Sequence, residues 1–240
     1  MAHRLRAAIS WSGGKDSLAA LTAARDTYDV VAAITMFDAQ GLRSRSHGLR
    51  PELVASQASQ LGLRALGARC EWPTYNAVFT RLLRSLRLFD ITDVIFGDIL
   101  FPEHREWAEA RCAEAGLRAV EPLWGQATDV LLDACLAAGT RALLVTVRRP
   151  FLDEHWLGHP LDASLKLLFA ERGIDPCGER GEYHTAVVDG PAFARPIAVD
   201  HGIRVVRGDC TALDLIPRDV PATSMEWLPD TGAHDHAASR

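Results

Sequence analysis

A chain of 240 residues, 48% of them hydrophobic, can bury one large core, or one such core with a small appendage. Its net charge of −5 at pH 7 argues against a nucleic-acid partner, because phosphate backbones are bound by surfaces with a basic excess. No apolar run approaches the roughly 20 residues that cross a bilayer, and no signal-type apolar block follows Met1–Arg6. We therefore expect a cytoplasmic protein with no membrane partner. The five cysteines form no C-x-x-C pair, which argues against a disulfide framework and a zinc centre.

The first predicted strand, Leu5–Trp11, is followed directly by a glycine-containing loop and the helical run Leu18–Arg25. A strand that ends in glycines and opens a helix directs backbone N–H groups and the positive end of the helix dipole at one point, which suits an anion. Serine hydroxyls add donors, and a lysine supplies positive charge for a polyphosphate. The loop therefore predicts nucleotide binding by Ser12, Gly13, Gly14, Lys15, Asp16 and Ser17.

This loop differs from the Walker pattern G-x-x-x-x-G-K-[ST]. Ile9 stands where that pattern has its first glycine, and Asp16 follows Lys15 where it has a serine or threonine. A dinucleotide fingerprint G-x-G-x-x-G is also absent. The six residues instead resemble the S-G-G-x-D-S loop of the PP-loop ATP pyrophosphatases, and the resemblance implies a grip on the β and γ phosphates of ATP.

Further along the chain, apolar runs that predict strands alternate with helical patterns. The predicted strands are Val30–Phe37, Arg64–Glu71, Val94–Ile99 and Ala142–Val147, and the predicted helices are Pro51–Gln60, Tyr75–Leu88, Glu103–Ala115 and Ala127–Ala138. This alternation predicts an α/β fold with a doubly wound parallel sheet of Rossmann-like type. Ligands bind beyond the carboxyl ends of such strands, so we expect Phe37, Gly97 and Asp98 to join the ATP site. Asp16 or Asp98 is the candidate ligand for Mg²⁺.

The alternation stops after Arg149-Pro150, which predicts a second, smaller unit. We expect an ATP-binding domain over residues 1–149 and an α+β subdomain over residues 150–216. The subdomain is predicted to hold the helix Leu161–Glu171 and the strands Tyr183–Val188 and Ile203–Gly208. The remaining residues, 217–240, are rich in proline and polar side chains and predict a disordered tail.

The second chemical motif is Gly178–Thr185, with the sequence G-E-R-G-E-Y-H-T. Two glycines alternating with Glu179 and Glu182 form a turn that can present both carboxylates to one place. Paired carboxylates can hold Mg²⁺, orient ammonia or transfer a proton. A charged surface turn leading into a strand is the alternative interpretation, and a histidine such as His184 is more often a strand residue bonded to its neighbours.

Together these motifs resemble the diphthine–ammonia ligase family, a branch of the PP-loop superfamily. That family carries S-G-G-K-D-S near its start, a late G-E-x-G-E-[FY]-x-T segment and then D-x-P-x-F. This chain matches them at Ser12–Ser17, Gly178–Thr185 and Asp189–Phe193. Weaker matches to the family's G-D-I…R…C…G-L…P-L-W block and L-G-x-x-L-D step fall at Gly97–Ile99, Arg105, Cys112, Gly116–Leu117, Pro122–Trp124 and Leu157–Asp162.

The resemblance implies that ATP adenylates an acceptor carboxylate, that pyrophosphate leaves, and that ammonia displaces AMP to give an amide. It implies ATP and Mg²⁺ as cofactors and an acceptor carboxylate on a protein or a small molecule. We expect catalytic roles for Lys15, Asp16, Glu179 and Glu182. We expect contacts with the substrate from His47, Arg105, Tyr183, His184 and Thr185.

Two other functions fit parts of the sequence. A PP-loop enzyme that modifies tRNA is one, although paired redox cysteines and a basic appended domain are missing. An ATP-binding module without turnover is the other, and it predicts ATP binding with no release of pyrophosphate. A homodimer is also among our expectations.

Overall fold

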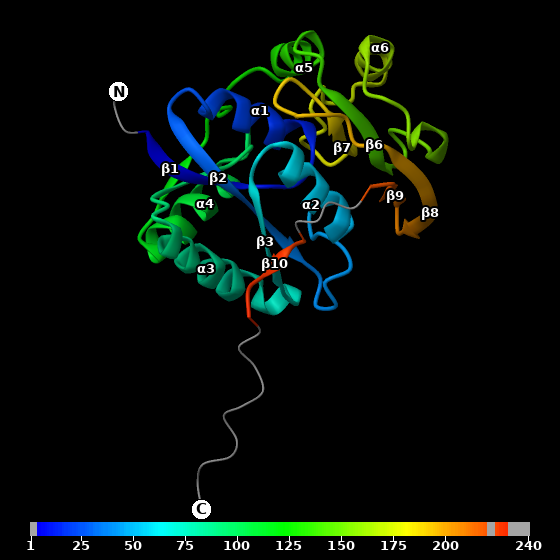
Figure 1. Cartoon of the computed structure of the whole chain (residues 1–240). Coiled ribbons are helices and arrows are strands. Elements are labelled where there is room, and N and C mark those ends of the chain that lie inside the picture. The colour runs from blue at the N-terminus through cyan, green and yellow to red at the C-terminus, as the bar shows by residue number, and fades with distance from the viewer. Residues whose placement is uncertain (1–3, 220–223, 230–240) are drawn as a thin grey trace, which may run out of the picture.

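The computed structural model describes residues 4–219 and 224–229, which form two separate sheets (Figure 1). All six strands of the first sheet are parallel, in the order β10-β3-β2-β1-β4-β5. Its strands are β1 (Leu5–Ser10), β2 (Tyr28–Phe37), β3 (Arg64–Arg69), β4 (Asp93–Ile95), β5 (Arg118–Val120) and β10 (Glu226–Trp227). The predicted doubly wound parallel sheet is confirmed.

Helices cover both faces of this sheet because the strand side chains alternate between two cores. Ile9 points into one core with α1 and α2, whereas Ala8 points into the other with α3 and α4. The helices are α1 (Lys15–Ala24), α2 (Pro51–Gln60), α3 (Tyr75–Leu86), α4 (Pro102–Ala115), α5 (Thr128–Ala137) and α6 (Ala163–Arg172), with short 3-10 turns at Trp72–Thr74, Arg87–Phe89 and Glu154–Trp156. Each predicted helix is present. None of the helices in residues 4–219 and 224–229 combines the length and the apolar character that a bilayer crossing requires.

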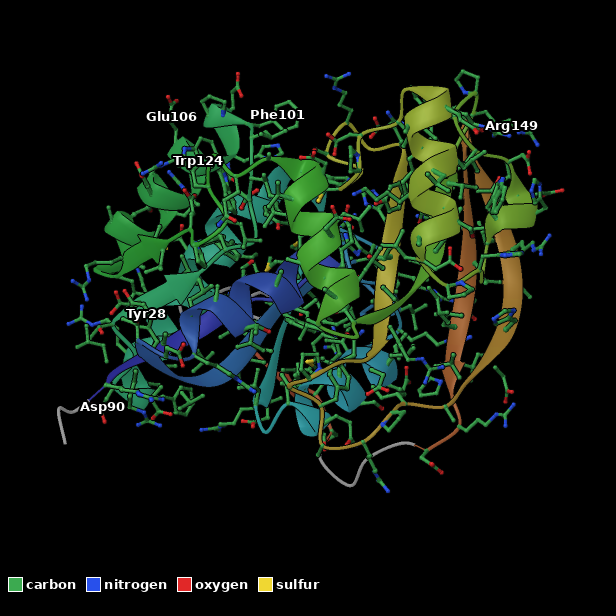
Figure 2. The ribbon with its side chains drawn as sticks, turned by 90° about the horizontal axis from the view of Figure 1, so that it is seen from above. Tyr28, Asp90, Phe101, Glu106, Trp124 and Arg149 are labelled. Carbon is green, nitrogen blue, oxygen red and sulfur yellow. The ribbon has the colours of Figure 1, made fainter. Side chains whose placement is uncertain are left out.

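The second sheet is antiparallel, in the order β7-β6-β9-β8. Its strands are β6 (Arg141–Arg148), β7 (Tyr183–Asp189), β8 (Val199–Arg207) and β9 (Cys210–Pro217). Helix α6 covers it, with the Phe169 ring stacked 4.8 Å from that of Tyr183. Seen from above, this sheet and Arg149 lie on the side of the molecule opposite Tyr28 and Asp90 (Figure 2).

Our assignment of Ala142–Val147 to the parallel sheet is wrong, because this run is the core of β6 and pairs with β7 and β9. Its side chains are largely buried, and a continuous apolar pattern is the same for any strand covered on both faces. The pattern therefore predicts the strand but not the sheet that it joins. Strands β5, β9 and β10 were not predicted.

The predicted tail contains a strand. Glu226 and Trp227 pair with Leu66 and Gly67 at the edge of the parallel sheet, and Arg64 holds Glu226 in an ion pair of 2.6 Å. A strand of two residues is too short to carry a periodic signal, so it was not visible in the sequence. Residues 220–223 and 230–240 of the tail lie outside the described residues. The division at residues 149/150 and 216/217 stays a proposal.

Candidate active site

A pocket of about 330 Å³ opens at the carboxyl ends of β1, β2 and β4. The segment Cys177–Gly181 and the first residues of β7 form its opposite wall. The structure therefore brings together most of the predicted site residues, although they come from distant parts of the chain. Those that line the pocket are Ser12, Lys15, Asp16, Ser17, His47, Gly97, Asp98, Glu179, Tyr183, His184 and Thr185.

The loop between β1 and α1 takes a shape that requires its two glycines. Gly13 has φ +84°, and a Cβ there would overlap Leu49 Cδ1. A Cβ on Gly14 would overlap the imidazole of His47. The Ser12 and Ser17 hydroxyl oxygens lie 2.7 Å apart, and Ser12 Oγ accepts the Gly14 N–H at 3.2 Å.

Helix α1 begins at this loop with its N-terminus at the pocket. Gly14 is the N-cap and has no capping side chain, and the amides of Asp16 and Ser17 have no intrahelical acceptor. The segment that follows β4 approaches closely here, because a Cβ on Gly97 would lie 3.1 Å from Ser17 N. The geometry thus gathers free amides, hydroxyls and a helix N-terminus, which together suit an anionic group.

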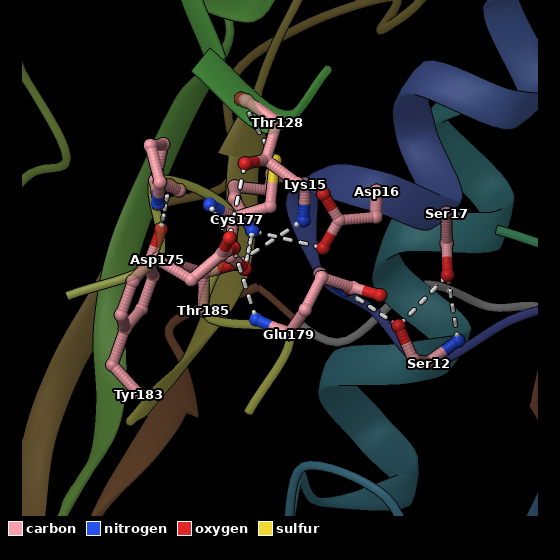
Figure 3. A network of polar contacts seen from close by, with 12 residues as sticks. Ser12, Lys15, Asp16, Ser17, Thr128, Asp175, Cys177, Glu179, Tyr183 and Thr185 are labelled. Atoms are coloured by element: carbon pink, nitrogen blue, oxygen red, sulfur yellow. Dashed lines mark hydrogen bonds and ion pairs between the residues drawn. The ribbon is translucent and has the colours of Figure 1, made fainter. Parts of the chain in front are cut away.

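Lys15 lies beneath this loop as a buried cation, only 2% exposed. Its ammonium donates to Asp16 Oδ2 at 2.8 Å and to the carbonyl oxygen of Cys177 at 2.5 Å (Figure 3). It also lies 5.1 Å from the centre of the Tyr183 ring. Burial acts to lower the pKa of Lys15, but the neighbouring Asp16 carboxylate overcomes it and the net pKa is raised well above the usual value. Lys15 is therefore a permanent positive charge in the wall of the pocket.

The segment Asp175–Gly181 faces Lys15 across the pocket and is fixed by side-chain hydrogen bonds (Figure 3). Asp175 Oδ1 accepts the N–H groups of Cys177 at 2.9 Å and of Glu179 at 3.2 Å. Asp175 Oδ2 accepts the hydroxyl of Thr128 in α5 at 3.0 Å. This arrangement holds the Cys177 carbonyl against Lys15 and points the Glu179 side chain toward Ser12 and Asp16.

Glu182, for which we predicted a catalytic role, does not line the pocket. Its carboxylate is buried and accepts the backbone N–H groups of Asp175 at 3.1 Å and Arg180 at 3.0 Å. The two glutamates of the motif are therefore not a pair facing one place. Glu179 enters the pocket, whereas Glu182 holds the segment that carries it.

The polar end of the pocket contains three carboxylates, those of Asp16, Asp98 and Glu179. Burial raises the pKa of Glu179 to about 7, and the charge of Asp16 acts in the same direction. Burial also raises the pKa of Asp98, whose Oδ1 lies 3.3 Å from Nδ1 of His104. Among the described residues, no group of three or more His, Cys, Asp or Glu side chains is arranged to hold a metal ion. Mg²⁺ is commonly held by one or two carboxylates with substrate phosphates, and Asp16 and Asp98 fit a site of that kind.

His47 and His184 stack on each other, with ring centres 4.6 Å apart and planes inclined by 22°. Burial lowers the pKa of His47 to about 4 and, together with the adjacent His47, that of His184 to about 3. Both rings are therefore neutral at pH 7. Because His47 Nδ1 lies 2.8 Å from the Thr185 carbonyl oxygen, it carries the proton, and Nε2 is left as an acceptor.

The other end of the pocket is apolar and was not predicted. Ile34 and Met36 of β2, Tyr75 and Phe79 of α3, and Phe96 line it. In the sequence these residues have the types and spacings of ordinary core residues. They do fill the space between the parallel sheet and α3. Only the fold shows that they flank a cavity.

Gln57 of α2 is another residue that sequence reasoning missed. It is fully buried, and its amide donates to the carbonyl oxygens of Gly13 at 3.0 Å and Val187 at 2.8 Å. Its Oε1 accepts the indole N–H of Trp11 at 2.9 Å. The side chain thus ties the loop to β7, and a glutamine in an otherwise apolar helix face was the available signal.

Arg105 and Phe37, like Gly13, Gly14 and Glu182, are predicted site residues that do not line the pocket. Arg105 of α4 pairs with Glu109 at 2.9 Å and Glu121 at 3.2 Å and lies over the Trp124 ring, on the side of the molecule where Figure 2 labels Trp124. Phe37 is buried with its ring 5.1 Å from that of Trp227. The Arg105 side chain is therefore engaged in ion pairs, and the Phe37 side chain in packing.

A parallel α/β sheet whose first strand ends in S-G-G-K-D-S, with a pocket at that carboxyl end, defines a protein of the PP-loop class. The chain belongs to the diphthamide synthase family. It matches the N-terminal domain of that family over residues 5–119 and the C-terminal domain over residues 128–215.

Several curated proteins named diphthine–ammonia ligase are similar to the chain. The protein of Bos taurus is 29% identical over 136 residues, which are 55% of this chain and 51% of that protein. The human protein is 28% identical over 144 residues, 58% of this chain and 54% of that protein. The Schizosaccharomyces pombe protein is 34% identical over 113 residues, 46% of this chain and 19% of that protein. The chain thus spans about half the length of the mammalian relatives that it matches, and less of the yeast protein.

Among solved structures, a predicted subunit of tRNA methyltransferase from Methanocaldococcus jannaschii matches with 18% identity and a TM-score of 0.40. The match covers 78% of this chain and 98% of that chain.

Proposed function

We propose that this chain is an ATP-dependent, AMP-forming ligase that converts a carboxylate into an amide with ammonia. The relatives named diphthine–ammonia ligase support diphthine as the acceptor. In the first half-reaction a carboxylate oxygen attacks the α phosphorus of ATP, the bond to the bridging oxygen breaks, and pyrophosphate leaves. In the second, nitrogen bonds to the acyl carbon, the bond to AMP breaks, and nitrogen loses a proton.

The observation that carries this proposal is the loop over Lys15. The amides of Asp16 and Ser17, the hydroxyl of Ser12 and the buried Lys15 ammonium face one end of the pocket. Groups fixed in this way stabilise the charge that develops on departing pyrophosphate, because they need no rearrangement during the reaction. Mg²⁺ held at Asp16 or Asp98 would neutralise phosphate charge in addition.

We place the adenosine of ATP at the apolar end of the pocket. Tyr75, Phe79 and Phe96 offer aromatic surface there, and the carboxyl end of β2 offers backbone groups. A site of this composition fits a purine, which needs apolar contact and a few polar groups for orientation. The cavity of about 330 Å³ runs from these side chains to the loop, so one nucleotide spans both ends.

We assign to Glu179 the role of accepting the proton that nitrogen loses in the second half-reaction. Its pKa of about 7 suits a group that accepts a proton near neutral pH. Its side chain points toward the loop on the wall of the same pocket (Figure 3). His47 and His184, which are neutral, present acceptors without adding positive charge, and we assign them contacts with the nitrogen donor or the acceptor.

The decisive test is the pattern of products. The purified chain is incubated with ATP, ammonium and a diphthine-containing acceptor protein, and AMP and pyrophosphate are measured against ADP and phosphate. An amide ligase of this type gives AMP and pyrophosphate in proportion to amide. ATP binding without either product would support a nucleotide-binding module instead. Assembly as a homodimer stays a prediction, measured by the mass in solution.

A further inference from the structure

Residues 38–50 connect β2 to α2 and carry His47 to the pocket. The segment folds back on itself, since the Ser44 N–H donates to the Leu49 carbonyl at 2.8 Å and Ser44 Oγ accepts the Leu49 N–H at 3.0 Å. The Arg45 N–H donates to the Met36 carbonyl at 2.8 Å. His47 therefore lies within a compact turn, Ser44–Leu49, that is flanked by Arg43 and Arg50.

One carboxylate of the second sheet pairs with the two arginines that flank the Ser44–Leu49 turn. Asp214 of β9 accepts Arg50 Nε at 2.8 Å and Arg50 Nη2 at 2.5 Å, and it also pairs with Arg43 Nη1. The Asp214 side chain is only 3% exposed, whereas those of Arg43 and Arg50 are 25% and 35% exposed. Charge-assisted hydrogen bonds from two guanidinium groups on one buried carboxylate form a specific clamp.

The neighbouring strand β8 leaves room for this carboxylate. The pairing of β8 with β9 shifts in register between His201 and Arg204, opposite Asp214. Gly202 lies within that irregularity, and a Cβ there would come 2.9 Å from Asp214 Oδ2. A bulge and a glycine opposite a buried charged side chain indicate that β8 is shaped to accommodate the Asp214 carboxylate.

The segment that the clamp holds, residues 38–50, contacts the phosphate-binding loop. The Leu49 side chain occupies the space that a Cβ of Gly13 would need, and the His47 imidazole occupies that of Gly14. His47 Nδ1 is also fixed by the Thr185 carbonyl at 2.8 Å. Displacement of residues 38–50 would therefore move His47 away from the loop and from His184. No residue that lines the pocket would need to be substituted for this to happen.

We propose that Asp214 is a positioning residue that acts through Arg43 and Arg50 to hold His47 against the phosphate-binding loop. This inference rests on the proposed function only for its kinetic consequence, since the position of the segment can be measured without turnover. Misplacement of a reacting group by about 1 Å lowers turnover by about a hundredfold, so the effect on catalysis is large compared with that on folding.

The test compares Asp214→Asn with Asp200→Asn as the matched control. Asp200 lies on adjacent β8 and pairs with Arg218 at 2.7 Å, but its side chain is 56% exposed and its partner lies outside the 38–50 segment. Hydrogen exchange is measured on the full chain for residues 38–50 and for α1. For Asp214→Asn we expect exchange in residues 38–50 to rise by about tenfold or more, with α1 unchanged.

Turnover is then measured for the same two variants. We expect kcat for AMP formation to fall by about tenfold to a hundredfold in Asp214→Asn, with the KM for ATP changed far less, and to stay near wild type in Asp200→Asn. Should Asp214→Asn fail to fold, Arg43→Gln loosens one arm of the clamp and is measured in its place. Unchanged exchange in residues 38–50, or an equal loss of kcat in Asp200→Asn, overturns the inference. Absence of AMP from the wild type overturns the proposed function alone, because the exchange result still stands.

Discussion

Lys15 and Asp16 are adjacent in the chain and paired in the pocket, at 2.8 Å. A cation that is almost fully buried must be compensated, and here the compensation comes from one carboxylate and one backbone carbonyl. The Asp16 carboxylate offsets the charge of Lys15, whereas the Cys177 carbonyl orients the ammonium without neutralising it.

Replacing Lys15 with alanine should lower the rate of pyrophosphate formation by about a hundredfold or more, because a preorganised positive charge is lost from the transition state. The chain offers a matched control, since its one other lysine is Lys166, which pairs with Asp133 on the surface. Lys166→Ala should keep the wild-type rate. Equal rates for Lys15→Ala and the wild type would remove Lys15 from the site.

The pH dependence of the amidation step should report on Glu179. A proton acceptor works only when deprotonated, so at a constant concentration of free ammonia kcat should rise with pH through about 7 and level off above it. In Glu179→Gln this rising limb should disappear along with most of the activity. A rising limb that persists in the glutamine variant would assign the titration to another group.

Among the site residues, the contiguous motif was predictable and the assembled neighbours were not. Ser12–Ser17 could be read from the sequence because a strand, a glycine turn and a helix start follow one another without a break. Glu182 was misjudged, because sequence spacing does not show whether a turn carboxylate faces a cavity or its own backbone. Tyr75 and Gln57 were missed, because their roles depend on contacts across the fold.

At the scale of elements, helices were predicted better than the sheets that they cover. Pro51 and Pro102 begin α2 and α4, and Gly116, with φ +73°, ends α4, so local chemistry sets these boundaries. Strand β6 was recognised but assigned to the wrong sheet, because partner choice is decided by tertiary contacts. Strand β10 has two residues and no pattern to detect.

The link between β9 and residues 38–50 should weaken in acid. Burial acts to raise the pKa of Asp214, but the hydrogen bonds from Arg50 and Arg43 overcome it and the pKa falls to about 2. A carboxylate with a depressed pKa stabilises the fold above its unfolded pKa of 3.8, and this contribution is lost as pH falls toward 2. It amounts to about 2 kcal/mol.

Urea unfolding of the wild type and Asp214→Asn checks this expectation. The difference in their free energies of unfolding should be larger at pH 5 than at pH 2.5, by about 1.5 kcal/mol. A difference that does not change with pH over this range would show that Asp214 contributes through packing and not through charge.

At the scale of the whole molecule, the pocket lies where the two sheets meet. The parallel sheet supplies the loop between β1 and α1, whereas β7 supplies Thr185, whose hydroxyl accepts the Lys15 N–H at 3.1 Å. Val187 of β7 donates its N–H to the Gly13 carbonyl at 2.8 Å. One core of buried side chains continues from the parallel sheet into the second sheet. The pocket is therefore formed jointly by both parts of the chain.

This joint construction predicts that ATP stabilises the whole chain in one cooperative transition. At an ATP concentration about 100 times Kd, the gain is about 2.7 kcal/mol. For a chain of this size that corresponds to a rise in Tm of roughly 5–10 °C. Differential scanning calorimetry should show a single shifted peak, and Lys15→Ala should lose most of the shift. Two separate peaks, with one of them insensitive to ATP, would speak against a shared site.

The most direct test of the account is the fate of the bond between the α and β phosphates of ATP. With ammonium and a diphthine-containing acceptor present, the wild type should release AMP and pyrophosphate in equal amounts, and Lys15→Ala should release neither at a comparable rate. Formation of ADP and phosphate, or wild-type release of pyrophosphate by Lys15→Ala, would contradict the assignment of the loop.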